Sequence, residues 1–180
     1  MTLYRATAEL VRADSTGRTI YGLAVPYGQT AEVDDGFGPY REQFEYGAFT
    51  RSIAERGHKV RLFAVHQTRK LPIGRATELR EASDGLHAAF TVARTRDGDE
   101  ALELVTSGIA DGLSVGFDGI RERRSPDGVI VRTEAALREV SLCAEGAYPG
   151  AVVAGVRSAH PPLSTDLAAR RLRLILEMFE

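Results

Sequence analysis

The sequence predicts an α+β domain: a mostly antiparallel barrel or sandwich of β-strands with a few helices packed around it. Short runs of alternating or β-branched residues recur along the chain and are separated by turn signals, among them residues 84–85 and 125–128. Helical spacing of apolar residues occurs mainly in residues 48–56, 101–109 and 164–178. Many short strands with few helices are the pattern expected of this fold class.

The composition is that of an ordinary globular domain. The chain has 180 residues, 43% of them hydrophobic and 27% charged, and a formal net charge of −2, so no basic field would recruit nucleic acid or an anionic membrane. No apolar run approaches the roughly 20 residues that span a bilayer, and the N-terminus lacks the basic-then-apolar layout of a signal peptide. Cys143 is the single cysteine and cannot form an internal disulfide, so the cytoplasm is the default expectation.

The first quarter of the chain predicts strands and a loop. Residues 3–12 alternate loosely and residues 19–25 are β-branched and aromatic, so we expect a hairpin. Residues 28–39 are rich in glycine and aspartate and are expected to form an exposed loop. The adjacent Asp34 and Asp35 are interpreted as solvated carboxylates rather than as a metal site.

The middle of the chain mixes helix and strand patterns. Residues 48–56 predict a short helix stopped by Gly57, and residues 101–109 a second helix capped by the acidic segment 97–100. The turn at residues 125–128 predicts a hairpin. The expected strands are residues 40–44, 59–66, 72–79, 86–92, 113–124, 129–134, 137–142 and 151–156.

A proline break separates the last segment from the rest of the chain. His160 precedes Pro161 and Pro162, and Ser164 then caps a final amphipathic helix. We therefore divide the chain into a domain of residues 1–157 and a C-terminal segment of residues 158–180. The sequence leaves open whether this helix packs on the domain, mediates dimerisation or docks a partner.

Three polar residues in strand-like runs form a candidate catalytic set. Ser114 points away from its apolar neighbours and is flanked by Gly112 and Gly116, whose missing Cβ atoms would let a substrate come close. His66 closes a short apolar strand, and Glu139 lies in a third strand-like run. A nucleophile, a base and an orienting acid are the parts that a serine hydrolase needs.

The three roles follow from side-chain chemistry. A serine hydroxyl needs a base to take its proton, and a histidine both accepts and returns it. A carboxylate such as Glu139 accepts the other imidazole N–H. The 25 residues from Ser114 to Glu139 leave room for one hairpin, so their strands are expected to lie close. His58, His87 and His160 have no comparable partner signal.

Two other residues compete as nucleophiles. Ser141 shares the predicted strand face of Glu139 but lacks flanking glycines. Cys143 is a candidate thiol nucleophile, although a small buried hydrophobe is the more frequent role of a lone cysteine. Both therefore rank below Ser114.

The order of these motifs resembles the prohead (procapsid maturation) serine protease family of tailed phages. The resemblance rests on a strand ending in His66, on GLSVGF at residues 112–117 and on REVSL at residues 138–142. The upstream segment FEYGAF, residues 44–49, also resembles that family. Because several motifs occur in order over most of the chain, the resemblance is fairly specific.

This resemblance implies a fold and a site. The fold would be a β-barrel surrounded by helices, as in the related herpesvirus assemblin proteases. His66 and Ser114 would be catalytic, and Glu139 stands where the assemblin relatives have a histidine. The loop with Gly146 and Ala147 would supply backbone N–H donors to the oxyanion. No metal and no organic cofactor are implied.

We therefore expect a serine endopeptidase that cleaves scaffold and capsid-protein segments during phage procapsid maturation, with self-cleavage as a further option. Its partners would be the major capsid protein and the scaffold protein, in a procapsid assembling in the bacterial host cytoplasm. Homodimerisation stays open, and neither nucleic acid nor a membrane is expected as a partner. The alternatives are a non-catalytic capsid assembly or scaffold protein on the same fold, and a hydrolase that uses Ser141 or Cys143.

Overall fold

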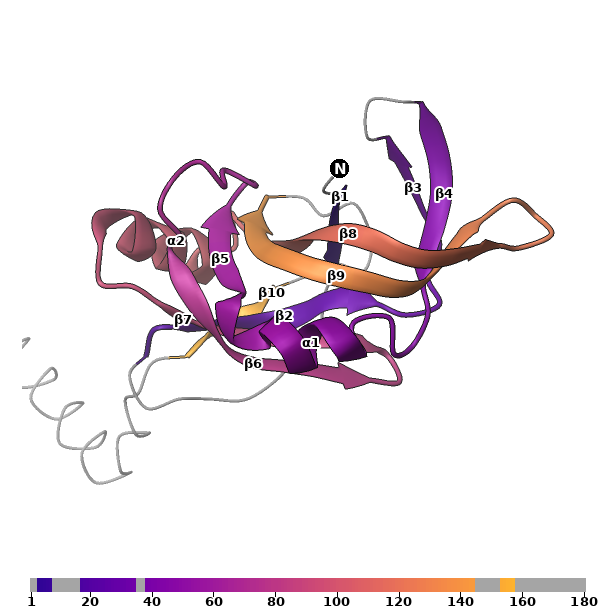
Figure 1. Cartoon of the computed structure of the whole chain (residues 1–180). Helices are drawn as coiled ribbons and strands as arrows, with labels where there is room; N and C mark the ends of the chain where they lie inside the picture. Colours follow the sequence, from indigo (N-terminus) through magenta and orange to yellow (C-terminus); the bar gives the residue numbers. More distant parts are fainter. Residues whose placement is uncertain (1–2, 8–16, 35–37, 145–152, 158–180) are drawn as a thin grey trace, which may run out of the picture.

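The computed structural model describes residues 3–7, 17–34, 38–144 and 153–157, and this part of the chain is mostly strand (Figure 1). The strands are β1 (Leu3–Thr7), β2 (Thr19–Pro26), β3 (Ala31–Asp34), β4 (Pro39–Phe44), β5 (Arg61–Ala64), β6 (Gly74–Ala82), β7 (Gly85–Val92), β8 (Gly112–Arg124), β9 (Ile130–Cys143) and β10 (Val153–Arg157). The helices are α1 (Thr50–Arg56) and α2 (Arg96–Thr106), and a 3₁₀ turn, Gly57–Lys59, follows α1. The predicted α+β class is confirmed.

All ten of these strands belong to one open sheet. Its hydrogen-bonded order is β1-β8-β9-β5-β6-β7-β2-β10, with β3 and β4 attached to β9 through a parallel β4–β9 pairing. Among the described residues, β1 pairs only with β8 and β10 only with β2. The expectation of a closed barrel is therefore wrong: β2 contacts β1 and β8, but no hydrogen-bonded ladder joins them.

Three local expectations also differ from the structure. β1 and β2 do not form a hairpin, because β1 pairs with β8 and β2 with β7 and β10. The expected loop at residues 28–39 contains β3, whose Ala31 and Val33 are buried in the core. The runs at residues 129–134 and 137–142 form one strand, β9, because bulges in its pairing with β8 absorb the irregular pattern between them.

The second helix begins earlier than the apolar pattern indicates. Thr95 is its N-cap, and the Thr95 hydroxyl accepts the Gly98 N–H at 3.2 Å. Asp97 and Asp99 lie in the first turn, where their charge suits the positive end of the helix. The acidic segment is thus part of the helix rather than its cap.

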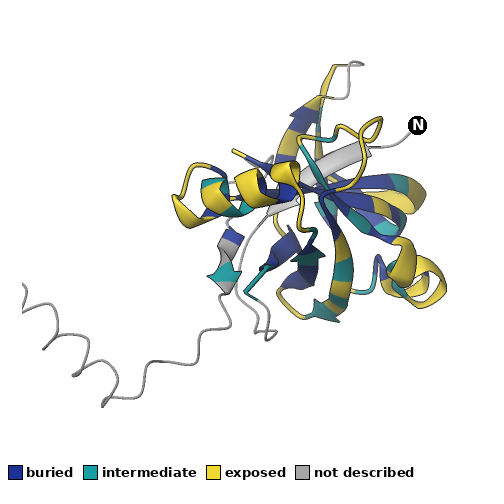
Figure 2. Ribbon diagram, turned by 90° about the vertical axis from the view of Figure 1, so that its left-hand side faces the viewer, coloured by how far each residue is buried: buried dark blue, intermediate teal, exposed yellow. Residues whose placement is uncertain are grey.

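The core centres on three fully buried aromatic rings from separate segments. The Phe44 ring stacks on Phe49, with centroids 5.2 Å apart, and meets Phe117 edge to face at 5.0 Å. Such pairs each add about 0.5–1.5 kcal/mol beyond the burial of their area. In Figure 2 the dark blue, buried residues lie mainly on the strands, whereas the helices and several loops carry much of the exposed surface. The cluster joins β4, the start of α1 and β8.

Helix α1 is fixed to β9 by hydrogen bonds. The Ser52 hydroxyl accepts the Leu137 N–H at 2.8 Å, and the Ala48 carbonyl accepts the Ala135 N–H at 2.7 Å. β9 pairs with β4 at residues 130–132 and with β5 at residues 140–142, and these contacts satisfy backbone donors in the stretch between the two pairings. They hold β9 just before Glu139.

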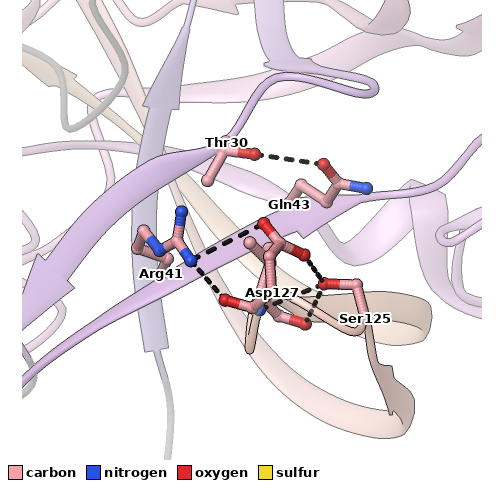
Figure 3. Close-up of polar contacts among 6 residues, drawn as sticks. Thr30, Arg41, Gln43, Ser125 and Asp127 are labelled. Atoms are coloured by element: carbon pink, nitrogen blue, oxygen red, sulfur yellow. Dashed lines mark hydrogen bonds and ion pairs between the residues drawn. The ribbon is translucent and has the colours of Figure 1, made fainter.

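Strands β8 and β9 form a long hairpin that runs across the molecule in Figure 1. Its tip is attached to β4, as Figure 3 shows: the Arg41 guanidinium contacts the Asp127 carboxylate at 3.6 Å and also bonds the Asp127 carbonyl. The Ser125 hydroxyl donates to the same carboxylate, which lowers the pKa of Asp127. These contacts are exposed, so they orient the tip more than they stabilise it.

Two predictions lie outside the described residues. They concern the loop with Gly146 and Ala147 and the helix expected within residues 158–180, and the division of the chain at residue 157 stays a prediction with them. In the part of the chain that the structure covers, neither helix has the length and apolar character needed to cross a membrane.

Candidate active site

Strand β9 occupies the centre of the candidate site. β8 lies antiparallel on one side, with Ser114 opposite Ser141, and β5 lies parallel on the other, with Phe63 opposite Ser141. Glu139 and Ser141 are two residues apart and therefore share a face of the sheet. The strands of Ser114 and Glu139 are neighbours, as the sequence predicts.

His66 is not the last residue of a strand but the second residue of a tight turn. β5 ends at Ala64, and Val65 and His66 then adopt φ values of 45° and 56°. This left-handed region is unfavourable for residues other than glycine, and β-branched valine is rarely found there. The Val65 N–H donates to the Leu142 carbonyl at 2.9 Å, and the His66 N–H donates to the Ser141 hydroxyl at 3.0 Å. Contacts to β9 thus hold the turn.

The turn brings the imidazole between the other two predicted residues. His66 Nδ1 lies 2.7 Å from Glu139 Oε1, and His66 Nε2 lies 2.7 Å from Ser114 Oγ. With its proton on Nδ1, the ring donates to the carboxylate, and its Nε2 lone pair accepts from the serine hydroxyl. Ser114, His66 and Glu139 therefore form one continuous hydrogen-bonded chain.

Ser141 adds a fourth member to this chain. Its hydroxyl donates to Glu139 Oε2 at 2.7 Å while accepting the His66 backbone N–H, and the residue is completely buried. Both carboxylate oxygens of Glu139 thus accept a hydrogen bond. The sequence does not predict this contact, and its only signal is the two-residue spacing from Glu139.

The site is buried except at the imidazole. Glu139 and Ser114 are 3% and 5% exposed, whereas the His66 side chain keeps 22% exposure. A carboxylate removed from water requires hydrogen-bond donors, and here His66 and Ser141 provide them. A positive charge that develops on the imidazole would interact strongly with the Glu139 carboxylate, because little water screens the two groups.

Cys143 lies on the same strand face as Glu139 and Ser141 but is not part of the hydrogen-bonded series that links Ser114, His66, Glu139 and Ser141. Its side chain is buried, and burial together with the Glu139 charge raises the pKa of its thiol to about 11. The neutral thiol therefore predominates at neutral pH, and a neutral thiol is a poor nucleophile. The geometry favours Ser114 over both rival nucleophiles.

The remaining predicted histidines lie elsewhere. His58 is exposed, and His87 is buried and bonded to the Asp84 carboxylate at 3.0 Å, a contact that lowers the pKa of Asp84. His160 lies outside the described residues. Within the described part, no three His, Cys, Asp or Glu side chains are grouped so that they could hold a metal ion.

Comparison with known proteins identifies the family. The profile of the caudovirus prohead serine proteases matches residues 6–163. The chain belongs to this family. It is also 32% identical over 115 residues to the prohead protease of Enterobacteria phage HK97, a match covering 62% of this chain and 51% of that protein, so it spans about half the length of this relative. The predicted family is confirmed.

A solved structure is also similar. The capsid assembly protease of bacteriophage T4 matches with a TM-score of 0.46 and 9% identity, over 69% of this chain and 96% of that chain. The relation to herpesvirus assemblin proteases stays a prediction.

Proposed function

We propose that this chain is a serine endopeptidase of phage prohead maturation, with Ser114 as nucleophile, His66 as general base and Glu139 as orienting acid. The observation that carries the proposal is the pair of contacts on the His66 ring, each 2.7 Å long, that link the hydroxyl to the carboxylate. Family membership supports the reaction class, and the geometry supports the assignment of roles.

The proposed reaction follows from these contacts. As Ser114 Oγ attacks the carbonyl carbon of the scissile peptide, its proton passes to His66 Nε2, and Glu139 stabilises the imidazolium that forms. Collapse of the tetrahedral intermediate breaks the C–N bond, and the same proton goes to the leaving amine. Water then loses a proton to Nε2, attacks the acyl-enzyme and releases the new carboxylate, with the proton returning to Ser114.

The oxyanion of the intermediate needs separate donors. We assign this role to the backbone N–H groups of Gly146 and Ala147, on the family resemblance of the loop that follows β9. Ala147→Pro removes one of these donors and is expected to lower kcat by about 10²- to 10³-fold. Ala147→Ser, which keeps the N–H, is the matched control, and equal rates for the two variants would contradict the assignment.

The proposed substrates are segments of the major capsid and scaffold proteins, with self-cleavage as an additional reaction, in a procapsid assembling in the bacterial cytoplasm. The family description and the name of the similar prohead protease support this setting. Homodimerisation is a further proposal, for which residues 158–180 are the candidate segment.

Co-expression with the cognate capsid and scaffold proteins tests the proposal. Intact-mass measurement should find shortened chains with the wild type and with Ser83→Ala, which alters an exposed serine in the β6–β7 turn, but not with Ser114→Ala. Uncut chains in assembled wild-type particles would support the non-catalytic assembly protein instead. Cleavage by Ser114→Ala would contradict the assigned nucleophile.

A further inference from the structure

Ser141 contacts both the acid and the base of the proposed triad through a single hydroxyl group. The hydroxyl donates to Glu139 Oε2 at 2.7 Å and accepts the His66 N–H at 3.0 Å. The first contact fixes the carboxylate rotamer that presents Oε1 to the imidazole. The second fixes the backbone from which the imidazole extends.

We propose that Ser141 is a positioning residue that holds His66 and Glu139 in reactive geometry, an inference that rests on the proposed function. The backbone at Val65 and His66 is the reason that such a residue is needed. Two successive residues with φ of 45° and 56° store strain of about 1–3 kcal/mol each. Without the bond from Ser141, His66 loses one of the contacts that hold this conformation and its ring is free to move off Ser114.

Two buried serines, Ser141 in β9 and Ser52 in α1, allow a matched comparison. Ser141→Ala removes the hydroxyl between His66 and Glu139, whereas Ser52→Ala removes a buried hydroxyl that accepts the Leu137 N–H away from the site. The substrate would be a peptide that spans a cleavage site mapped in the co-expression experiment. A second readout is the rate at which a fluorophosphonate labels Ser114, which requires no peptide binding.

Ser141→Ala is expected to lower kcat and the labelling rate by about 10- to 100-fold with little change in KM, because only the geometry of the reacting groups is lost. It should also shift or remove the low-field proton resonance of His66 Nδ1, and Ser141→Thr, which keeps the hydroxyl, should restore the rates. Ser52→Ala should lower the unfolding temperature but not the rates.

Wild-type rates in Ser141→Ala, or parallel losses in both alanine variants, would overturn the inference. Failure of the wild type to be labelled would instead contradict the proposed function.

A second observation concerns a cavity of about 310 Å³ beside the site. Val65 and Gln67, the neighbours of His66, line one side of it, and Leu142 and Cys143 at the end of β9 line another. From α2, the apolar Ala101 and Leu104 and the charged Asp97 and Glu100 also line it. Val65 and Ile109, two of the large apolar residues most exposed to solvent, belong to the lining, at 58% and 63% exposure.

We infer that this cavity binds an apolar side chain of the substrate within two residues of the scissile bond, which again rests on the proposed function. Cys143 lies two strand positions beyond Ser141, the residue paired with Ser114, which is about 7 Å along the strand. An extended peptide covers that distance in two residues. The lining is mostly apolar with a few charged groups, Lys70, Asp97 and Glu100, which is the composition of sites that bind an apolar group in a fixed orientation.

Two exposed isoleucines provide the test. Ile109→Asp places a charge on the cavity wall, and Ile120→Asp places one on the distant part of β8, where Ile120 is 52% exposed. Ile109→Asp should lower kcat/KM for the peptide by about tenfold or more, while fluorophosphonate labelling of Ser114 stays unchanged. Ile120→Asp should change neither quantity.

A substituted peptide identifies the occupant. Replacing the apolar residue nearest the cut by Asn should lower wild-type cleavage strongly but add little to the loss in Ile109→Asp, because both changes remove the same contact. Equal rates for the two aspartate variants, additive losses, or mapped cuts without an apolar residue within two positions would each overturn the inference. Because labelling of Ser114 is measured in parallel, these outcomes are separate from failure of the proposed triad.

Discussion

The two halves of the β8–β9 hairpin have the same strand geometry but different surroundings. In the half that carries Ser114, residues 112–117 of β8 are all buried, whereas residues 119–124 near the tip are all exposed. The first half is flanked by β1 and β5, whereas the second pairs with β4 at residues 130–132 of β9. Neighbouring strands, rather than the hairpin itself, create the dry environment in which a hydroxyl, an imidazole and a carboxylate interact strongly.

The polar groups of the two halves differ accordingly. Near the tip, Arg121–Glu134 and Arg123–Glu45 are ion pairs of 3.2 and 3.4 Å whose arginines are largely exposed. Such pairs contribute about 0.2–1 kcal/mol each. In the buried half, His66, Glu139 and Ser141 satisfy one another. Substitutions in the two halves should therefore affect different properties.

The largest expected effect is on catalysis in the buried half. Glu139→Gln replaces the carboxylate that bonds His66 Nδ1 by a neutral amide, and so removes the charge proposed to stabilise the imidazolium. It should lower kcat by about 10³- to 10⁴-fold with a cooperative unfolding transition retained. Glu134→Gln, on the outer part of the same strand, serves as the control. Activity in Glu139→Gln equal to that of the control would contradict the role of Glu139.

The next largest expected effect is on the free energy of unfolding, and it involves Arg132 of β9, near the tip of the hairpin. The Arg132 guanidinium bonds the fully buried Glu42 carboxylate at 2.9 Å and lies 5.7 Å from the Phe117 ring. Gly119 leaves room for it, since a Cβ there would lie 3.0 Å from Arg132 Nη1. Arg132→Met leaves a buried carboxylate without this partner and should lower the free energy of unfolding by about 3–5 kcal/mol.

Urea denaturation measures that change, and Arg123→Met provides the comparison because its ion pair is exposed. The difference between the two variants tests whether burial determines how much an arginine ion pair contributes to the free energy of unfolding. Equal losses in both variants would show that the burial of Arg132 does not increase its contribution.

A smaller effect is expected at Cys143. Because the pKa of its thiol is raised to about 11, the thiol is neutral at pH 7, and its reaction with iodoacetamide in the native protein should accelerate only as the pH rises toward 11. Cys143→Ala should keep kcat within a few-fold of the wild type. Loss of activity in Cys143→Ala, with labelling of Ser114 absent, would favour the thiol hydrolase.

The smallest effect is expected at the tip. Arg41→Ala removes the contacts with Asp127 shown in Figure 3, and both side chains are about half exposed or more. The free energy of unfolding should change by less than about 1 kcal/mol, and the change should shrink in high salt. A larger loss in urea denaturation would mean that the tip contributes to the stability of the buried half.

Particular residues show what the sequence could predict. The alternation around Ser114 and the turn at residues 125–128 identified the hairpin, and the two-residue periodicity placed Glu139 and Ser141 on one face. These are local patterns that the backbone geometry of a strand imposes. The candidate triad could therefore be assembled before its geometry was known.

The rest depends on contacts between distant parts of the chain. The left-handed turn at Val65 and His66 is held by Leu142 and Ser141, more than 70 residues away, and nothing in the local sequence signals it. β1 pairs with β8 rather than with its neighbour β2, and the sheet stays open because β1 and β2 meet without a ladder. Such pairings are decided by the packing of the whole sheet.

Labelling with a fluorophosphonate tests the central claim most directly. The full chain, its His66→Ala variant and its His58→Ala variant, which alters an exposed histidine, would be treated alike, and the modified residue would be located by peptide mapping. We predict a single adduct on Ser114 in the wild type and in His58→Ala, and none in His66→Ala. An adduct on another residue, or labelling of Ser114 that persists without His66, would contradict it.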